Sequence, residues 1–147
     1  MLRSYAVALL LLLSFPLIAR SGDAPADALL NGTWLPAKAE FAGKPWPEEV
    51  RKIIKLVIDG EKYVVTVGDA PDKGTLKIDS SFEPKAIDIT GVEGPNKGKT
   101  YLAIYEQSDP DTLKICYDLS GNGRPTEFKS AAGTKLFLVT YTREKKN

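Results

Sequence analysis

Oxygen-bearing side chains follow one predicted strand at the spacing of a calcium loop. Asp118, Ser120 and Asn122 alternate along the chain and Gly123 comes next, which fits ligands at positions 1, 3 and 5 and glycine at position 6. The twelfth position of such a loop should carry a bidentate glutamate, and this chain has Lys129 there. Because a positive charge opposes a divalent cation, we expect a polar turn and no metal site.

Two other groups could support acid–base or nucleophilic chemistry. Asp109 and Asp111 lie together in a predicted hairpin tip, but acid–base catalysis needs a carboxyl group whose pKa is shifted by burial or by a charged neighbour. Cys116 is the only cysteine, and a reactive thiol needs a lowered pKa and usually a basic partner. We therefore expect ordinary turn chemistry at the tip and a small packed side chain at Cys116.

The chain contains no histidine, and this composition excludes several classes of enzyme. Catalytic Ser-His-Asp and Cys-His sites and histidine-bearing zinc centres all require that side chain. The glycine-rich phosphate-binding patterns and the CxxC pattern are also missing from the sequence. We predict a protein without catalytic residues or cofactor, since an enzyme would have to rely on carboxylates or lysines alone.

The N-terminus has the organisation of a signal peptide. A basic residue near the start precedes an apolar run over residues 5–19, which is short for a membrane span of about 20 apolar residues. We expect residues 1–21 to be removed by cleavage after Ser21, although cleavage after Ala28 would also fit a small-x-small pattern. The mature domain would then comprise residues 22–147 and be exported, to the periplasm or the exterior.

Charge and cysteine content limit the partners of the mature chain. Removal of Arg3 and Arg20 changes the formal charge from +1 to −1. A nearly neutral chain gives no electrostatic reason to bind nucleic acid or an anionic membrane. One cysteine allows no internal disulfide. We expect a monomer with no nucleic-acid partner and no stable membrane insertion.

Short runs with the two-residue alternation of half-buried strands fill the mature sequence. Turn signals separate these runs at residues 59–60, 70–73, 91–99, 108–111 and 121–125. The predicted strands are residues 32–41, 54–59, 62–68, 74–79, 86–92, 100–107, 112–119 and 135–143. One helix-like segment covers residues 47–53, with proline and acidic residues in its first turn.

About eight strands with short connections predict an all-β fold. A closed antiparallel barrel is favoured because closure removes exposed strand edges, and a two-sheet sandwich is the competing architecture.

The first strand opens with Asn31-Gly32-Thr33-Trp34, which permits two further interpretations. Asn31 fits the acceptor pattern for N-glycosylation, but the pattern is common and Asn-Gly also suits a flexible start to a strand. Gly32 and Trp34 match the G-x-W signature that opens lipocalin-type barrels, and Arg143 closes the last predicted strand. We favour the strand-opening interpretation over the glycan.

Further motifs in order along the chain strengthen that match. They are GTW, AGKPWPEE, LVIDGEKYVVT, KGTLKID, PKAIDI, GKTYLAIYE, DTLKICYD and RPTEF. Over residues 30–143 the chain resembles the lipocalin-like domain family of uncharacterised planctomycetal proteins. The resemblance implies a lipocalin-like barrel, often exported, with no established activity or ligand. It also implies that Trp34 packs at the closed end of the barrel and that Arg143 crosses over it.

Two hypotheses follow for the interior and surface of such a barrel. An eight-stranded barrel is just wide enough to be filled by side chains or to hold one small ligand, and the sequence does not separate these cases. If it is hollow, Tyr63, Tyr101, Tyr105 and Tyr117 are the predicted lining for a small apolar or amphipathic molecule, with residues 47–53 as a cover.

If the barrel is filled, we expect a protein-interaction module of the cell envelope. Its contact loop would contain Arg124, Pro125 and Phe128, because arginine and phenylalanine suit interface anchors. The competing interpretation of this loop is that it only packs against the barrel.

Overall fold

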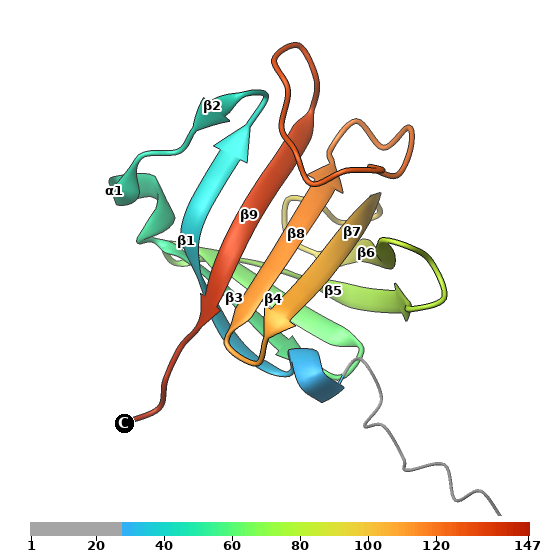
Figure 1. The fold of residues 1–147 in the computed structure, drawn as a ribbon. Coiled ribbons are helices and arrows are strands. Elements are labelled where there is room, and N and C mark those ends of the chain that lie inside the picture. The colour runs from blue at the N-terminus through green and yellow to red at the C-terminus, as the bar shows by residue number, and fades with distance from the viewer. Residues whose placement is uncertain (1–27) are drawn as a thin grey trace, which may run out of the picture.

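The computed structural model describes residues 28–147, so the predicted signal peptide lies outside the described residues. Strands dominate the fold, and the only helices are one short α-helix and one turn of 3₁₀-helix in this part of the chain (Figure 1). The elements in chain order are η1 (Ala28–Leu30), β1 (Gly32–Phe41), β2 (Lys44–Pro45), α1 (Glu48–Arg51), β3 (Ile54–Asp59), β4 (Lys62–Val67), β5 (Ala70–Asp79), β6 (Lys85–Glu93), β7 (Thr100–Asp109), β8 (Thr112–Asp118) and β9 (Leu136–Arg143).

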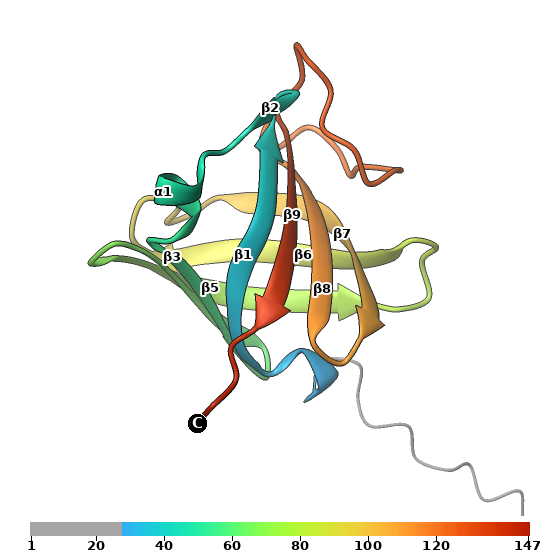
Figure 2. The same cartoon turned by 60° about the vertical axis from the view of Figure 1, so that its left-hand side comes forward.

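Eight of the strands form a closed antiparallel barrel. From β3 to β9 each strand pairs with its neighbour in sequence, β1 pairs with β3, and the short β2 pairs only with β1. The ring is closed by β1 and β9, in a register that runs from Trp34 opposite Arg143 to Phe41 opposite Phe137 (Figure 2). The predicted barrel is therefore confirmed, and the two-sheet sandwich is wrong.

One predicted turn is wrong, and the error matters for function. Residues 70–73 form the start of β5, where Pro71 lies opposite Thr66 and Asp72 opposite Val65 of β4. On its other side β5 begins to pair with β6 only at Lys73, opposite Glu93. Pro71 therefore lies at a free edge of the sheet, where its missing N–H breaks no hydrogen bond.

The ends of some other predicted elements also differ from the structure. Strand β6 continues to Glu93, one residue beyond the predicted strand, and residues 108–109, predicted as part of a turn, continue β7. The helix-like segment at 47–53 is confirmed only over α1, which has Pro47 at its N-cap. In each lengthened strand, pairing with the adjacent strand outweighs the local preference of these residues for a turn.

The barrel has two distinct ends. The start of β1, the end of β9 and η1 meet at one end, which we call the closed end (Figure 1). The opposite end, which we call the open end, carries α1, the β4–β5 turn, residues 94–99 and the long loop of residues 119–135 (Figures 1 and 2). Within residues 28–147 no helix is long and apolar enough to cross a membrane.

Some side chains on the outer face of the barrel are also buried. Ala86, Ile104 and Cys116 are paired across β6, β7 and β8 and are buried although they point away from the interior. The loop of residues 119–135 reaches this face, where the Cys116 thiol donates to the Lys129 carbonyl oxygen at 3.4 Å. Cys116 is 0% exposed and is therefore a packed residue, and this burial raises the pKa of its thiol.

Candidate functional site

The closed end is filled by Trp34. Its side chain is 0% exposed, and its indole N–H donates to the Leu30 carbonyl oxygen at 2.8 Å. The guanidinium carbon of Arg143 lies 4.2 Å from the centre of the Trp34 ring, within the range of a cation–π contact. The two residues that the sequence expects at the closed end thus lie in direct contact there.

Arg143 also ties together three chain segments at the closed end. Its guanidinium donates to the carbonyl oxygens of Leu29 (3.0 Å), Pro110 (2.9 Å) and Asn31. Gly32 leaves room for this group, because a Cβ there would clash with Nη1 of Arg143. The planar guanidinium satisfies carbonyl groups that no strand pairs and holds η1 against the barrel.

The Asn31 side chain is used within the chain as well. Its Oδ1 atom accepts a hydrogen bond from the backbone N–H of Gly60 at 2.7 Å, which joins the start of β1 to the β3–β4 turn. Asn31 thus acts as part of the strand opening.

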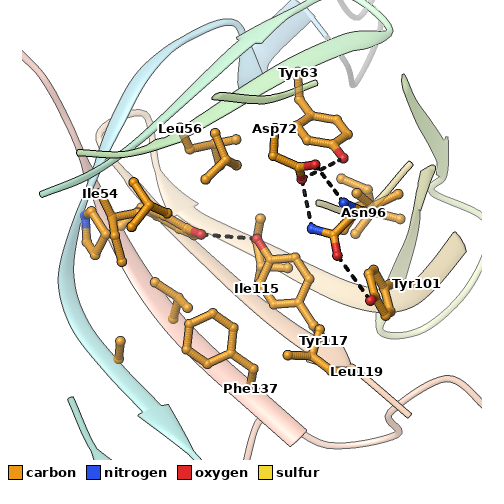
Figure 3. A pocket seen from close by; sticks show the side chains of 18 of the residues that line it. Ile54, Leu56, Tyr63, Asp72, Asn96, Tyr101, Ile115, Tyr117, Leu119 and Phe137 are labelled. Carbon is orange, nitrogen blue, oxygen red and sulfur yellow. Dashed lines mark hydrogen bonds between the residues drawn. The ribbon is translucent and has the colours of Figure 1, made fainter. Parts of the chain in front are cut away.

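An apolar cavity occupies the barrel interior toward the open end (Figure 3). Its volume is about 230 Å³, and its walls come from β1, β3 to β9, and the connections that contain Trp46, Asn96 and Leu119. Aliphatic and aromatic side chains make up most of the lining, including Leu56, Val65, Ile89, Ile115, Tyr117, Phe137 and Val139. The interior of this barrel is therefore not completely filled by side chains.

A polar cluster interrupts the apolar wall at Asp72. The carboxylate accepts hydrogen bonds from the Tyr63 hydroxyl (3.3 Å), the Asn96 side-chain amide (2.9 Å) and the Asn96 backbone N–H (3.2 Å). Tyr101 donates its hydroxyl to Asn96 Oδ1 at 3.2 Å and completes the cluster. Figure 3 shows the four side chains gathered on one side of the cavity.

Two glycines place Asn96 beside Asp72. Gly94 has a φ of +98°, and a Cβ on it would lie 2.7 Å from the Pro71 carbonyl oxygen and 3.0 Å from Asp72 Cα. A Cβ on Gly91 would clash with the backbone of Asn96. Because neither glycine has a side chain, the loop of residues 94–99 can fold closely onto β5.

A third glycine places Tyr63. Gly74 of β5 lies opposite Tyr63 of β4, and a Cβ there would lie 2.7 Å from Cε1 of the Tyr63 ring. The ring therefore lies across the strand and carries its hydroxyl to Asp72. Burial, followed by the nearby charge of Asp72, raises the pKa of Tyr63 to about 12, so this hydroxyl remains a donor at neutral pH.

Aromatic rings form another wall of the cavity. The ring centres of Trp46 and Phe137 are 4.6 Å apart, and those of Tyr117 and Phe137 are 5.7 Å apart. Arg51 of α1 donates its Nε–H to the Trp46 carbonyl oxygen at 3.3 Å and an Nη1–H to the Ala37 carbonyl. The helix has no buried residue, so its contribution is to hold Trp46 in place and not to plug the barrel.

Two tyrosine hydroxyls meet deeper in the cavity wall. Tyr117 and Tyr141 are joined by a hydrogen bond of 3.1 Å between their oxygen atoms. Burial raises the pKa of both groups, to about 12 for Tyr141. This pair satisfies two polar atoms within the chain and leaves the surrounding wall apolar.

Only three of the four tyrosines that the sequence assigns to a pocket line the cavity. Tyr63, Tyr101 and Tyr117 line the cavity, whereas Tyr105 is buried in the core and is not among the lining residues. Tyr105 faces the interior nearer the closed end, since β7 runs from Tyr101 toward that end.

The sequence interpretation missed the polar part of the site. Asp72 and Asn96 lie in segments interpreted as turns, and turn residues are normally assigned to solvent. The detectable signals were the glycines at 91 and 94 and the glycine within the strand at 74, each of which marks a close approach of backbone.

The loop residues assigned to a partner surface make contacts within the chain. Arg124 forms an ion pair with Asp88 and donates to the Ala103 carbonyl oxygen at 2.7 Å. Pro125 is buried, and Phe128 is half-buried with the Lys114 ammonium 5.7 Å from its ring centre. These contacts are those of a loop that packs against the barrel.

The acidic turns have structural hydrogen bonds. Asp118 Oδ1 accepts the backbone N–H of Ser120 at 2.9 Å, and Asp109 Oδ1 accepts that of Asp111 at 2.8 Å. Lys129, at the twelfth position of the calcium-like pattern, pairs with Glu127 at 2.8 Å. Over residues 28–147, no three or more cysteine, aspartate or glutamate side chains are grouped so that they could hold a metal ion.

Comparison with known proteins gives no relative from which a function could be transferred. No protein-family model matches the chain, and neither a curated protein nor a solved structure matches it. The functional assignment must therefore come from the cavity and its chemistry.

Proposed function

We propose that this chain is a lipocalin-like binding protein that holds a small apolar or amphipathic molecule in its barrel and catalyses no reaction. The observation that carries this proposal is the apolar cavity at the open end. Ligand sites are typically concave and mainly apolar, with a few polar groups that orient the ligand. The cavity with its Asp72 cluster has this composition.

The volume of the cavity limits the size of the ligand. In another protein, an apolar cavity of about 150 Å³ accepts benzene. At about 230 Å³, the cavity of this barrel suits a single ring with a short side chain or a short acyl chain. Larger lipids would need the open-end connections to move.

A filled-cavity variant tests this proposal. Ala39 lines the cavity and is 2% exposed, so Ala39→Phe places a ring inside the barrel. We expect calorimetry with 2-phenylethanol to detect binding to the mature protein and none to Ala39→Phe. Ala37→Phe adds the same ring at an exposed position two residues away and should retain binding. Thermal unfolding of both variants controls for overpacking of the barrel.

Native mass spectrometry of protein purified from its own source provides an independent test. A retained small molecule would support the binding role. Protein that is always empty, together with equal 2-phenylethanol binding by wild type and Ala39→Phe, would refute it.

Export and oligomeric state are part of the same proposal. A signal peptide at residues 1–21 would deliver a monomeric barrel to the periplasm or the exterior, and the intact mass of the natural protein would reveal cleavage after Ser21. The alternative, a filled barrel that binds a protein through residues 124–128, is less well supported. Its loop contacts the barrel itself, and the interior contains a cavity.

A further inference from the structure

We infer that the open-end cavity takes a small molecule with a protonated amine at one end and an aromatic or short aliphatic body. This inference rests on the proposed binding function and adds the chemical class of the ligand. Its basis is the carboxylate of Asp72, which faces an otherwise uncharged cavity whose walls include several aromatic rings.

The charge of Asp72 has no ionic partner within the described chain. Its hydrogen-bond donors are the neutral hydroxyl of Tyr63 and the neutral amides of Asn96. No ion pair in residues 28–147 includes Asp72, and no lysine or arginine there lines the cavity. A ligand cation would supply the missing opposite charge and a charge-assisted hydrogen bond.

The carboxylate also has capacity for another donor. An ionised carboxylate offers about four acceptor positions, and three of those on Asp72 are used. Oδ2 accepts both side-chain donors, while Oδ1 accepts only the backbone N–H of Asn96. One acceptor position of the carboxylate therefore remains for an ammonium group, with the existing cluster intact.

The cluster is held in a fixed position before any ligand arrives. Tyr63 is confined by the backbone of Gly74, and Asn96 is brought to β5 by Gly91 and Gly94. Tyr101 in turn fixes the side-chain oxygen of Asn96, so its amide group points at Asp72. A preorganised acceptor lowers the entropy lost on binding.

The rest of the cavity suits the body of such a ligand. Trp46, Tyr117 and Phe137 provide an aromatic wall on which a ring can pack, and their faces also attract a cation. A ligand carboxylate would meet the like charge of Asp72 and is disfavoured. A divalent metal ion is also disfavoured, because Asp72 is the only carboxylate among the described lining residues.

Three probes of similar size test the inference on the mature protein. They are 2-phenylethylamine, its uncharged analogue 2-phenylethanol and the anion 3-phenylpropionate, each titrated by calorimetry at neutral pH and fixed ionic strength. A charge-assisted hydrogen bond is roughly twice as strong as a neutral one, so we expect the amine to bind about tenfold more tightly than the alcohol. The anion should bind most weakly.

Paired charge variants locate the effect at Asp72. Asp72→Asn keeps the size of the side chain, and it should reduce the preference for the amine over the alcohol to about twofold or less. Asp69→Asn removes the same charge from an exposed position in the β4–β5 turn and should retain the full preference. The alcohol measures cavity integrity in each variant, and the three-probe series on wild type does not depend on variant folding.

The results distinguish failure of the amine assignment from failure of the proposed binding function. Equal binding of amine and alcohol by wild type would overturn the amine assignment while retaining the cavity as an apolar binding site. Tighter binding of the anion, or an amine preference that persists in Asp72→Asn but is lost in Asp69→Asn, would also overturn it. Failure of all three probes to bind would refute both the amine assignment and the proposed binding function.

Discussion

The two ends of the barrel each contain a charged side chain, but they use it differently. At the closed end Arg143 lies over Trp34 and donates to carbonyl oxygens of its own chain. At the open end Asp72 faces a cavity of about 230 Å³, and its hydrogen-bond donors among residues 28–147 are all neutral groups. The closed end is complete within the chain, whereas the open end retains an unbalanced charge and unfilled volume.

This contrast distinguishes a residue that stabilises the fold from one that is available for binding. A charge that is hydrogen-bonded to its own backbone contributes to stability, and replacing it should mainly affect unfolding. A charge that is held by neutral partners beside an apolar cavity is available to a ligand, and replacing it should mainly affect binding.

Replacement of Trp34 should cause the largest loss of stability. Trp34→Ala removes a fully buried ring and should lower the free energy of unfolding by about 3–5 kcal/mol in a urea titration. Trp46→Ala removes a half-buried ring from the open end and should cost less than half as much. A loss below about 1 kcal/mol for Trp34→Ala would contradict its role as the residue that fills the closed end.

Replacement of Arg143 by lysine should have the next largest effect. Lysine keeps the charge but lacks the planar array of donors that reaches Leu29, Asn31 and Pro110. We expect Arg143→Lys to lower the free energy of unfolding by roughly 1–3 kcal/mol in the same titration. Unchanged stability would show that the guanidinium contacts do not close the barrel.

Alkaline pH should destabilise the barrel through its buried tyrosines. The pKa values of Tyr63 and Tyr141 rise from 10.0 to about 12 in the folded chain. Because the pKa is higher in the folded chain, the protonated hydroxyls contribute their full stabilisation below pH 10. This contribution is lost as the pH rises from 10 through about 12. Urea titrations at several pH values should show falling stability across this interval.

Phenolate absorbance provides a direct check on those two hydroxyls. The native protein should show a late ionisation near pH 12, and Tyr141→Phe should reduce its amplitude. Ionisation of every tyrosine near pH 10 in folded protein would contradict the burial of these groups.

Replacement of Asp72 should have the smallest effect on stability. Asp72→Asn retains a side-chain oxygen that can accept from Tyr63, so we expect the free energy of unfolding to change by less than about 1 kcal/mol. A loss comparable with that of Trp34→Ala would show that the carboxylate is required for the fold, and the division between the two ends would fail.

The closed end was predictable because its signals are local in sequence. The G-x-W pattern at 32–34 and the arginine at the end of the last strand are short patterns, and the resemblance to lipocalin-type barrels implied their roles. The observed pairing of β1 with β9 places Trp34 opposite Arg143. The barrel itself followed from the number of strands and their short connections.

The open end was less predictable because its residues depend on nonlocal geometry. Ala70 to Lys73 contains proline and aspartate, which favour turns, but pairing with β4 makes this segment a strand and turns Asp72 into the barrel. Asn96 reaches Asp72 only because two glycines let its loop approach β5. Three of the four tyrosines assigned to a pocket do line the cavity, but the sequence gave no measure of whether they enclose empty volume.

A crystal structure of the mature protein with 2-phenylethylamine would test the central claim most directly. We expect the aromatic ring inside the barrel beside Trp46 and Phe137, with the amine nitrogen within hydrogen-bond distance of the Asp72 carboxylate. A barrel interior completely filled by side chains, or an amine bound outside it while Asp72 contacts only Tyr63 and Asn96, would contradict the account.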